Sequence, residues 1–334
     1  MKTGVAYFET RNLRHVREDL KDMVDHSCTF VVHCYPEYDL NFNSLVMRDI
    51  VAMTRDMGME AYINPWGLGR VFGGPEPYSH FIGEHPEECQ KNADGSHAPL
   101  ACLNSEPFRE FMRFWIDSAA ETGADVVFWD EPHFHFTTDV FFREPRPDEW
   151  SCRCERCKAL FYKQYGSHMP AVLDDEVIRF RDDNVVSFLS MLCDYTHEKG
   201  MKNAVCVLPD ENPLFGTSSW EKIAAIESMD IFGTDPYWMI QDKSLDEYVR
   251  SSCRRVMDIS SRQGIEAQVW VQAFLIWQGR EEEVRQAVEI MVEEGVENIA
   301  AWAYNGSAYW NHKCQDHEAV WRILGEAFAA ARER

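Results

Sequence analysis

The sequence predicts a (β/α)8 barrel, in which eight parallel strands form a closed ring and a helix follows each strand. Three observations lead to this prediction: a length of 334 residues, eight short apolar runs, and five glycines that each separate a helical pattern from the next apolar run. At about 40 residues for each strand and helix, the length fits eight such units. A doubly wound open sheet is the alternative, but no Gly-rich phosphate loop follows the first apolar run. We therefore expect one barrel domain over residues 1–334.

The apolar runs give the expected strands, and the glycines mark the turns that precede them. Glycine adopts the left-handed conformation just past a helix at little cost. The five glycines are Gly58, Gly123, Gly200, Gly264 and Gly295. Between the runs, apolar residues recur at helical spacing, as in residues 284–291 and 320–328. The eight runs lie near residues 4–9, 29–35, 60–65, 125–131, 203–209, 230–235, 267–274 and 298–304.

Two connections are much longer than the turns of a simple barrel, namely residues 66–103 after the third strand and 132–172 after the fourth. Loops of this size are usually functional, and both follow the carboxyl end of a strand, where barrels place their active sites. We expect them to form the walls of a deep pocket rather than a second domain.

Composition and charge restrict the partners of the chain. With 45% hydrophobic residues and 11 Trp, 12 Tyr and 20 Phe, the chain can bury a large core. The net charge of −23 and the lack of a Lys/Arg cluster disfavour nucleic acid, so a small neutral molecule is the expected ligand. No apolar run is long enough to span a membrane, and the N-terminal segment lacks the apolar core of a secretion signal. The 11 cysteines then favour a reducing compartment, and we expect a cytoplasmic protein. The sequence leaves the oligomeric state open.

The residues that close the expected strands are rich in carboxylates, amides and indoles. In a barrel these residues lie together at one end and form the site. Carboxylates can carry acid–base chemistry and indole rings can stack on pyranose faces, so the combination predicts a sugar-binding cleft. The strand-end residues are Glu9, Glu37, Asp39, Asn64, Trp66, Asp130, Glu131, His133, Asp210, Glu211, Asp235, Tyr237, Trp238, Trp270, Gln272, Trp302, Tyr304 and Asn305.

Asp130 and Glu131 are the leading catalytic candidates. They end the fourth apolar run, and because side chains alternate along a strand, only one of the two faces the barrel axis. Asp235 ends the sixth run in the same way, within Gly-Thr-Asp-Pro-Tyr-Trp, and is the third catalytic candidate. Substrate binding is expected of Glu37, Asn64, Trp66, His133, Glu211, Trp238, Gln272, Trp302, Tyr304 and Asn305.

The most specific local motif is a group of cysteines, Cys152-Arg-Cys154-Glu-Arg-Cys157. Three thiols within six residues are typical of a structural Zn²⁺ site with four ligands. The fourth ligand must come from elsewhere, and we expect it to be Cys102, at the end of the other long loop. The metal would then tie the two long loops together and leave no open position for a substrate.

These motifs resemble glycoside hydrolase family 42, the β-galactosidases, within the clan of retaining (β/α)8 glycosidases. The similarity covers residues 100–166 well and the rest of the chain as a barrel plan. The resemblance implies a zinc held by a lone cysteine and a Cys-x-Cys-x-x-Cys group, and it implies that Glu131 is the general acid/base. The matching segments are Cys102-Leu-Asn-Ser-Glu-Pro-Phe-Arg-Glu-Phe111, Asp130-Glu131-Pro-His133 and Cys152-x-Cys154-x-x-Cys157-Lys-Ala-Leu-Phe-x-x-x-Tyr165-Gly166.

The chain departs from this family at two positions. The nucleophile of the clan is a Glu that ends the seventh strand, but here Gln268-Val-Trp-Val-Gln272 ends in an amide, which cannot attack an anomeric carbon as a carboxylate does. The Asn that normally precedes the acid/base is Asp130. The second carboxylate is therefore Asp130 or Asp235. In an arrangement that pairs the fourth and sixth strands, Asp235 is instead the acid, and Asp130 or Glu131 is the nucleophile.

The leading prediction is thus a glycoside hydrolase that acts on a small neutral saccharide or glycoside. A non-catalytic sugar-binding relic of a glycosidase is one alternative, because Gln272 replaces the nucleophile. The other is a metal-dependent sugar isomerase, epimerase or lyase on the same barrel, with a metal held by His33, His133, Glu211 and Asp235.

Overall fold

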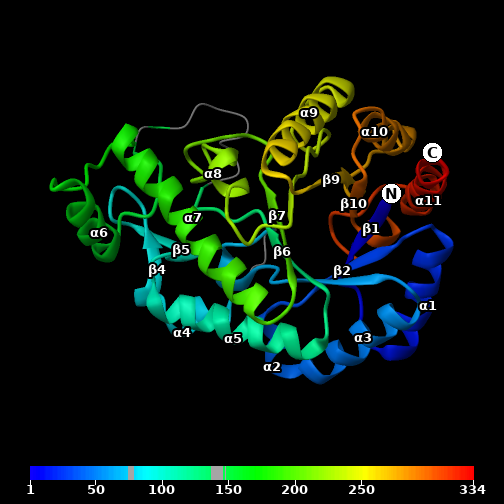
Figure 1. Cartoon of the computed structure of the whole chain (residues 1–334), viewed down its shortest axis with the longest axis horizontal. Coiled ribbons are helices and arrows are strands. Elements are labelled where there is room, and N and C mark those ends of the chain that lie inside the picture. The colour runs from blue at the N-terminus through cyan, green and yellow to red at the C-terminus, as the bar shows by residue number, and fades with distance from the viewer. Residues whose placement is uncertain (74–78, 137–145, 147) are drawn as a thin grey trace.

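Eight parallel strands close into a barrel in the computed structural model, which describes residues 1–73, 79–136, 146 and 148–334 (Figure 1). The barrel strands are β1 (Lys2–Tyr7), β2 (Phe30–Cys34), β3 (Glu60–Asn64), β6 (Val126–Asp130), β7 (Lys202–Val207), β8 (Ile231–Thr234), β9 (Glu266–Gln272) and β10 (Asn298–Trp302). Around the ring they follow the order β1-β10-β9-β8-β7-β6-β3-β2, and β2 pairs with β1 to close it. Each strand lies within two residues of a predicted run, so the predicted (β/α)8 barrel is confirmed.

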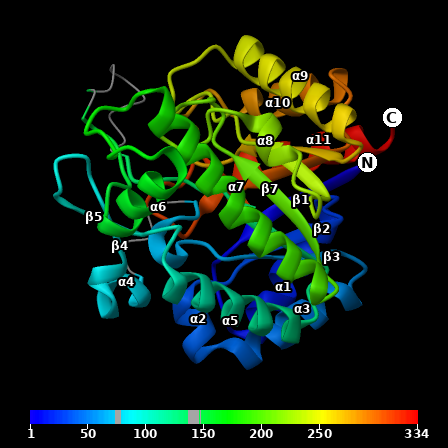
Figure 2. The same ribbon diagram turned by 60° about the vertical axis from the view of Figure 1, so that its left-hand side comes forward.

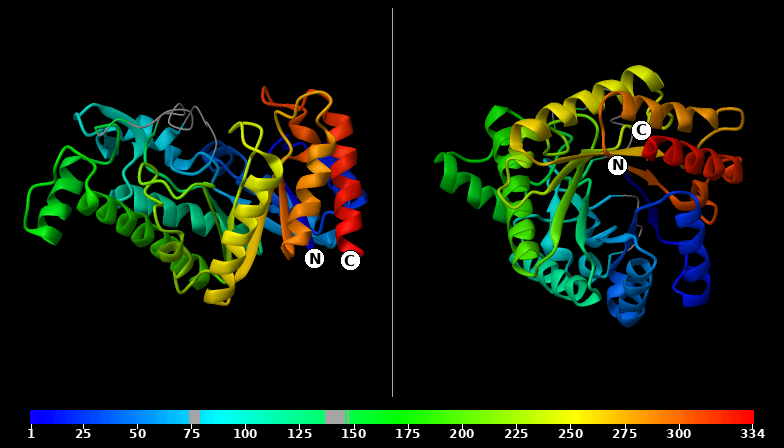
Figure 3. Two further views of the ribbon diagram at one scale, coloured as in Figure 1. Left: turned by 90° about the horizontal axis from the view of Figure 1, so that it is seen from above. Right: turned by 45° about the vertical axis from the view of Figure 1, so that its right-hand side comes forward.

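Helices connect the strands and surround the barrel, as the two views of Figure 3 show. Their inner faces carry the apolar residues of the helical patterns: the apolar positions of residues 284–291 and 320–328 are buried. The N-terminus and the C-terminus lie close together in Figures 1 to 3, since β1 pairs with β10, the strand that precedes the last helix. The helices are α1 (Leu13–Asp25), α2 (Glu37–Phe42), α3 (Ser44–Asp56), α4 (His80–Glu84), α5 (Glu106–Thr122), α6 (Glu155–Tyr165), α7 (Asp175–Glu198), α8 (Trp220–Ala224), α9 (Leu245–Gln263), α10 (Glu282–Glu293) and α11 (His317–Arg332), with short 3-10 turns at Leu68–Arg70, Pro86–Glu88 and Tyr304–Ser307.

The five glycines that precede strands adopt the backbone conformation that the sequence predicts. Their φ angles lie between 71° and 84°, in the left-handed region. A side chain at these positions would cost roughly 1 kcal/mol or more, because Cβ approaches the following carbonyl oxygen. These turns therefore fix where each helix ends and where the next strand can enter the barrel.

The interior of the barrel is filled by alternate residues of each strand. In β2, Phe30, Val32 and Cys34 belong to the interior cluster, whereas Val31 packs in the larger cluster between the strands and the helices. Gly4 of β1 leaves room for the ring of Phe30, because a Cβ there would overlap with that ring. Strands buried on both faces explain why the runs in the sequence are continuously apolar rather than alternating.

The two long connections form a structure of their own beside the barrel. The first contains a hairpin of β4 (Cys89–Lys91) and β5 (His97–Ala101), and the second contains α6. Backbone hydrogen bonds join them, from Ala93 N to Trp150 O at 2.9 Å and from Arg153 N to Lys91 O at 2.8 Å. Figures 1 and 2 show the hairpin and α6 at the end of the molecule that is far from the two termini. Residues 74–78, 137–145 and 147 of these connections lie outside the described residues.

Within the described part of the chain, we find no helix that combines the length and the apolar composition needed to cross a bilayer.

Candidate active site

Three carboxyl groups gather at the carboxyl ends of β6 and β8. Asp130 is the last residue of β6, Glu131 follows it, and Asp235 follows β8. Only β7 separates β6 from β8 in the ring. Asp130 and Asp235 are buried, and Glu131 is half-buried. The structure thus brings together the three residues that the sequence proposes as catalytic.

The carboxyl groups of Glu131 and Asp235 form a hydrogen bond with each other. Burial raises the pKa of both groups; the charge and hydrogen bond of Glu131 raise the pKa of Asp235 further, whereas the bond from Asp235 opposes the rise at Glu131. The two groups therefore share a proton and titrate as a pair. Burial, followed by the charge of Glu131, also raises the pKa of Asp130. A cluster that retains protons above the usual range of carboxylic acids suits general acid catalysis near neutral pH.

The backbone of Glu131 is strained, and its neighbours hold it in place. Its φ angle of 43° lies in the left-handed region, which costs a residue with a side chain about 1–2 kcal/mol. The N–H of Glu131 donates to Cys206 O at 2.9 Å, and its carbonyl oxygen accepts from Nδ1 of His133 at 2.5 Å. Burial lowers the pKa of His133 to about 4, so this ring is neutral near pH 7 with its proton on Nδ1. Strain of this kind is concentrated at functional sites, because only the surrounding structure can maintain it.

Asp130 is held by an amide and by a glycine. Nδ2 of Asn64, the last residue of β3, donates to Oδ2 of Asp130 at 3.4 Å. The N–H of Gly73 donates to Asp130 O at 2.8 Å, and Gly73 has a φ of 43°. A Cβ at Gly73 would overlap with the carboxyl group of Asp130. The first long loop thus packs directly against this carboxyl group, and glycine is the residue that permits the approach.

Aromatic rings form a wall beside the carboxyl cluster. The ring of Phe8 stacks on Trp66 at a centroid distance of 5.4 Å and on Trp302 at 5.7 Å. Trp310 meets Phe8 edge to face at 5.8 Å. The N–H of Tyr237 donates to Asp235 O at 2.7 Å, and burial and then the negative charges of the cluster raise the pKa of its hydroxyl group. Stacked rings next to buried carboxyl groups are a favourable surface for the apolar face of a sugar.

Two residues predicted to bind substrate hold loops in place, and their role in binding stays a prediction. Gln272 is buried; its Oε1 accepts from Met239 N at 3.0 Å, and its Nε2 donates to Phe274 O at 3.0 Å. The amide at the position of the clan's nucleophile therefore joins the loops that follow β8 and β9. Glu37 is also buried, and its carboxylate accepts hydrogen bonds from the first long loop, namely from Gly69 N, Ser79 Oγ and Phe81 N.

The remaining predicted substrate-binding residues make their contacts with the helical layer. Nε1 of Trp238 donates to Glu283 of α10 at 2.8 Å, and Tyr304 hydrogen-bonds with two aspartates of α1. Asn305 pairs with a histidine at the start of α11 at 3.2 Å. Glu211 is exposed and binds Arg255 of α9 at 3.0 Å. The structure does not bring these four side chains to the carboxyl cluster, and their predicted role in binding remains a prediction.

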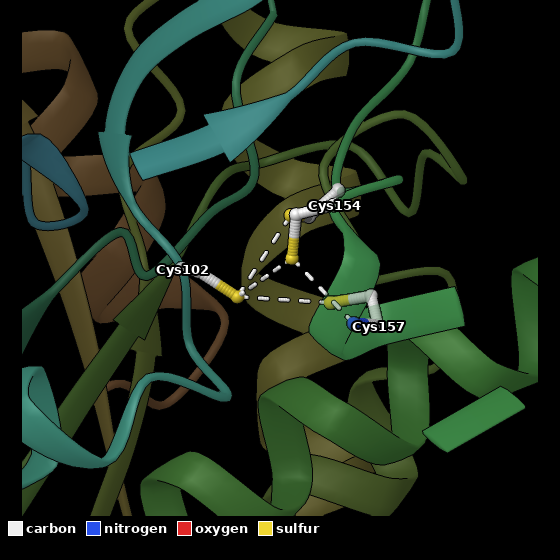
Figure 4. Close-up of side chains that lie close together, drawn as sticks. Cys102, Cys154 and Cys157 are labelled. Atoms are coloured by element: carbon white, nitrogen blue, oxygen red, sulfur yellow. Dashed lines mark hydrogen bonds between the residues drawn. The ribbon is translucent and has the colours of Figure 1, made fainter. Parts of the chain in front are cut away.

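Four cysteine sulfurs meet where the two long connections touch (Figure 4). The sulfur of Cys102 lies 3.8 Å from those of Cys152 and Cys154 and 3.6 Å from that of Cys157. In a tetrahedral site with Zn–S bonds of about 2.3 Å, neighbouring sulfurs are about 3.8 Å apart. The four predicted ligands therefore have the spacing that a metal ion requires. Among the described residues, these four cysteines are the cluster of potential ligands that could hold a metal ion.

Some residues of the site were not predicted from the sequence. Phe8 could have been found, because it continues the inward alternation of Gly4 and Ala6 in β1. Trp310 and Gly73 lie in loops, where the sequence carries no periodic signal. Their positions depend on how the loops fold over the barrel.

Comparison with known proteins agrees with the fold. No protein-family model and no curated protein matches the sequence. The endo-1,4-β-D-mannanase of Thermotoga petrophila RKU-1 superimposes with a TM-score of 0.60 at 9% identity, over 99% of each chain. The endo-1,4-β-mannanase of Rhizomucor miehei gives 0.62 at 11% identity, over 98% of this chain and 95% of that one. A D-allulose 3-epimerase of Methylomonas sp., solved with D-allulose, gives 0.53 at 10% identity, over 100% and 97%. At these identities the similarity establishes the (β/α)8 barrel, which this chain shares with glycoside hydrolases and a sugar epimerase.

Proposed function

We propose that the protein is a glycoside hydrolase that acts on a small neutral saccharide or glycoside. The observation that carries the proposal is the cluster of Asp130, Glu131 and Asp235, in which burial raises the pKa of each carboxyl group beside a wall of stacked aromatic rings. The mannanases that share the barrel, and the resemblance to glycoside hydrolase family 42 at residues 100–166, support the same class of reaction.

The hydrogen bond between Glu131 and Asp235 limits how these groups can act. Two carboxyl groups on opposite sides of a sugar ring are about 5–5.5 Å apart in retaining enzymes and about 6.5–9.5 Å apart in inverting ones. A hydrogen-bonded pair is closer than either separation. We therefore assign the pair to one side of the sugar ring, where Glu131 is the general acid/base and Asp235 stores and returns its proton. Asp130 is then the carboxylate that stabilises or attacks the anomeric centre. If the substrate separates the pair, Asp235 becomes the acid and Glu131 the nucleophile.

Leaving-group dependence distinguishes these assignments. A general acid matters for a leaving group of high pKa, such as a sugar or methyl alcohol, and matters little for dinitrophenol, which leaves as its anion. On alkyl glycosides, Glu131→Gln should lower kcat/KM by about 10²–10⁴-fold, and on dinitrophenyl glycosides it should lower it far less. Asp130→Asn should lower the rate on both substrates alike.

The control is Glu227→Gln, which changes an exposed carboxylate just before β8, at the opposite end of the barrel. An unchanged rate in Glu131→Gln, with folding intact, would contradict the assignment of Glu131. If Asp235→Asn shows the leaving-group dependence expected of the acid and Glu131→Gln does not, the roles of the two residues are exchanged.

We also propose that the four-cysteine cluster holds a structural zinc. Sulfur spacing fits Zn²⁺, and the surroundings offset the charge of four thiolates. Nδ2 of Asn104 donates to the sulfur of Cys157 at 3.4 Å, and the thiolates lie close enough to Arg156 and Arg181 to favour the charged forms of both. With four protein ligands the ion has no open position, so its contribution is to fix the two long connections against each other.

The metal-dependent alternative receives less support from the geometry. Nε2 of His33 hydrogen-bonds with Thr54 of α3 at 2.8 Å, and Glu211 binds Arg255, so two of the four proposed ligands engage the helical layer. The sugar-binding relic is tested by the substrate panel itself, because a relic would bind sugars and cleave none of the glycosides.

A further inference from the structure

A cavity of about 250 Å³ opens at the carboxyl ends of β1 and β2, and its wall includes the stacked rings of Phe8 and Trp66. Pockets for drug-sized ligands are about 300–1,000 Å³, so this one fits a ligand of about one sugar ring rather than a long chain. Its lining includes Phe8, Glu9, Arg11, Cys34, Asp39 and Trp66.

Two buried polar atoms of the cavity wall have no hydrogen-bond partner among the described residues: Oε1 of Glu9 and Nε1 of Trp66. One is an acceptor and the other is a donor. A buried polar atom without a partner destabilises the folded chain, so such atoms are rare unless a ligand or water supplies the missing hydrogen bond. The other carboxylate oxygen of Glu9 accepts from Phe8 N at 2.9 Å, which fixes the direction of the free oxygen.

The nearby cation does not satisfy Glu9. Arg11 binds Asp39 at 2.6 Å and donates to Cys34 O at 2.8 Å. Its guanidinium is therefore committed to α2 and β2. The ring of Trp66 is fixed as well, because it stacks on Phe8.

This pair of atoms discriminates between ligands. A hydroxyl group can donate to Oε1 of Glu9 and accept from Nε1 of Trp66, so a polyhydroxylated ring satisfies both atoms. An ammonium group has no lone pair, so it would leave Trp66 without an acceptor.

We propose that this cavity is a subsite for one neutral sugar ring, bound by a hydroxyl group that bridges Glu9 and Trp66. The inference rests on the proposed glycoside hydrolase function and adds a specificity determinant to it. The end of β3 links the subsite to the reaction centre, since Asn64 donates to Asp130 at 3.4 Å and Trp66, two residues later, lines the cavity. The ring bound here is therefore a neighbour of the ring at the carboxyl cluster, and the substrate is at least a disaccharide or a glycoside with a sugar-like aglycone.

Binding of monosaccharides to the whole chain tests the subsite without requiring catalysis. The probes are D-glucose, D-galactose and D-mannose, with D-glucosamine and inorganic phosphate as charged competitors, followed by saturation-transfer NMR and tryptophan fluorescence. Loss of one hydrogen bond should weaken binding of the preferred hexose about three- to tenfold, both in Glu9→Leu, which removes the carboxyl group, and in Trp66→Phe, which keeps the stacked ring. The monodeoxy sugar that lacks the bridging hydroxyl should bind the wild type and both variants equally.

Two controls make the result decisive. Glu227→Gln should leave the dissociation constant unchanged, and circular dichroism should show that each variant is folded. Hexose binding that is the same in the wild type and in both variants would overturn the subsite, as would stronger binding of glucosamine or phosphate than of every neutral hexose, or no hexose binding at all. Binding that depends on Glu9 in a protein that cleaves no glycoside would refute the proposed hydrolase and leave the subsite standing. Cleavage of glycosides with an unchanged kcat/KM and unchanged hexose binding in both variants would refute the subsite and leave the proposed hydrolase standing.

Discussion

Glu9→Gln should change how the stability of the protein depends on pH. Burial raises the pKa of Glu9 from 4.5 to about 8, because its carboxylate would lose water without gaining a paired cation. The folded chain therefore keeps this proton to a higher pH than the unfolded chain does. The contribution of Glu9 to the free energy of unfolding is fully present below about pH 4.5 and is lost as the pH rises through about 8. At about 1.36 kcal/mol for each pH unit between these values, the loss amounts to about 5 kcal/mol.

Urea unfolding at several pH values between 4 and 9 measures this effect. Glutamine cannot ionise, so the free energy of unfolding of Glu9→Gln, relative to that of the wild type, should rise by about 5 kcal/mol between the lowest and the highest pH; the variant becomes relatively more stable. The constant cost of burying an amide cancels in this difference. Glu227→Gln removes an exposed carboxylate and should show almost no such change. A parallel pH profile for Glu9→Gln and wild type would refute the reasoning, because it would mean that Glu9 ionises in the folded protein as it does in water.

Further predictions concern the carboxyl cluster and the metal site. Gly73→Ala should lower kcat/KM by about 10²-fold, because its Cβ displaces the carboxyl group of Asp130; Gly95→Ala is the matched control, since its φ of 87° costs the same backbone strain of about 1–2 kcal/mol but a Cβ there contacts nothing within 4 Å. Equal activity losses in both variants would contradict the role of Asp130. Purified protein should contain about one zinc per chain by elemental analysis, and a strong chelator should lower its Tm while turnover at low temperature persists. Cys152→Ser should lose the zinc and show the same lowered Tm; turnover that stops at once on chelation would instead favour a catalytic metal.

The barrel was predictable because its signals are local and repeated. Each strand is a short apolar run, and five helix ends carry a glycine in the left-handed conformation, so the eight units can be recognised one after another along the chain. The metal cluster was predictable for a related reason. Three of its cysteines lie within six residues, and Cys102 is supplied by the other long connection.

The detailed roles at the site depend on contacts between distant segments, which a sequence pattern does not contain. Gln272 and Trp302 both end strands, yet the amide joins two loops and the indole stacks on Phe8 in the barrel mouth. Residues that end a strand can point to the reaction centre, to the next loop or to the helical layer. The direction is decided by loops that lack a regular pattern, and so Gly73 and Trp310 could not be found from their own sequence context.

The distribution of charge indicates which carboxylates serve stability and which serve chemistry. Asp39 pairs with Arg11, Glu88 with Arg156 and Glu211 with Arg255, so these acids are stabilised by a cation. Among the described residues, no basic side chain forms a salt bridge with Asp130, Glu131, Asp235 or Glu9. Burial raises the pKa of all four carboxyl groups. Buried acids without a cation destabilise the folded chain at neutral pH. The chain already has a net charge of −23, and apolar residues at these four positions would avoid the cost of burying a carboxylate. Four such acids at one end of the barrel are therefore best explained by a requirement for proton transfer and for hydroxyl recognition at that end.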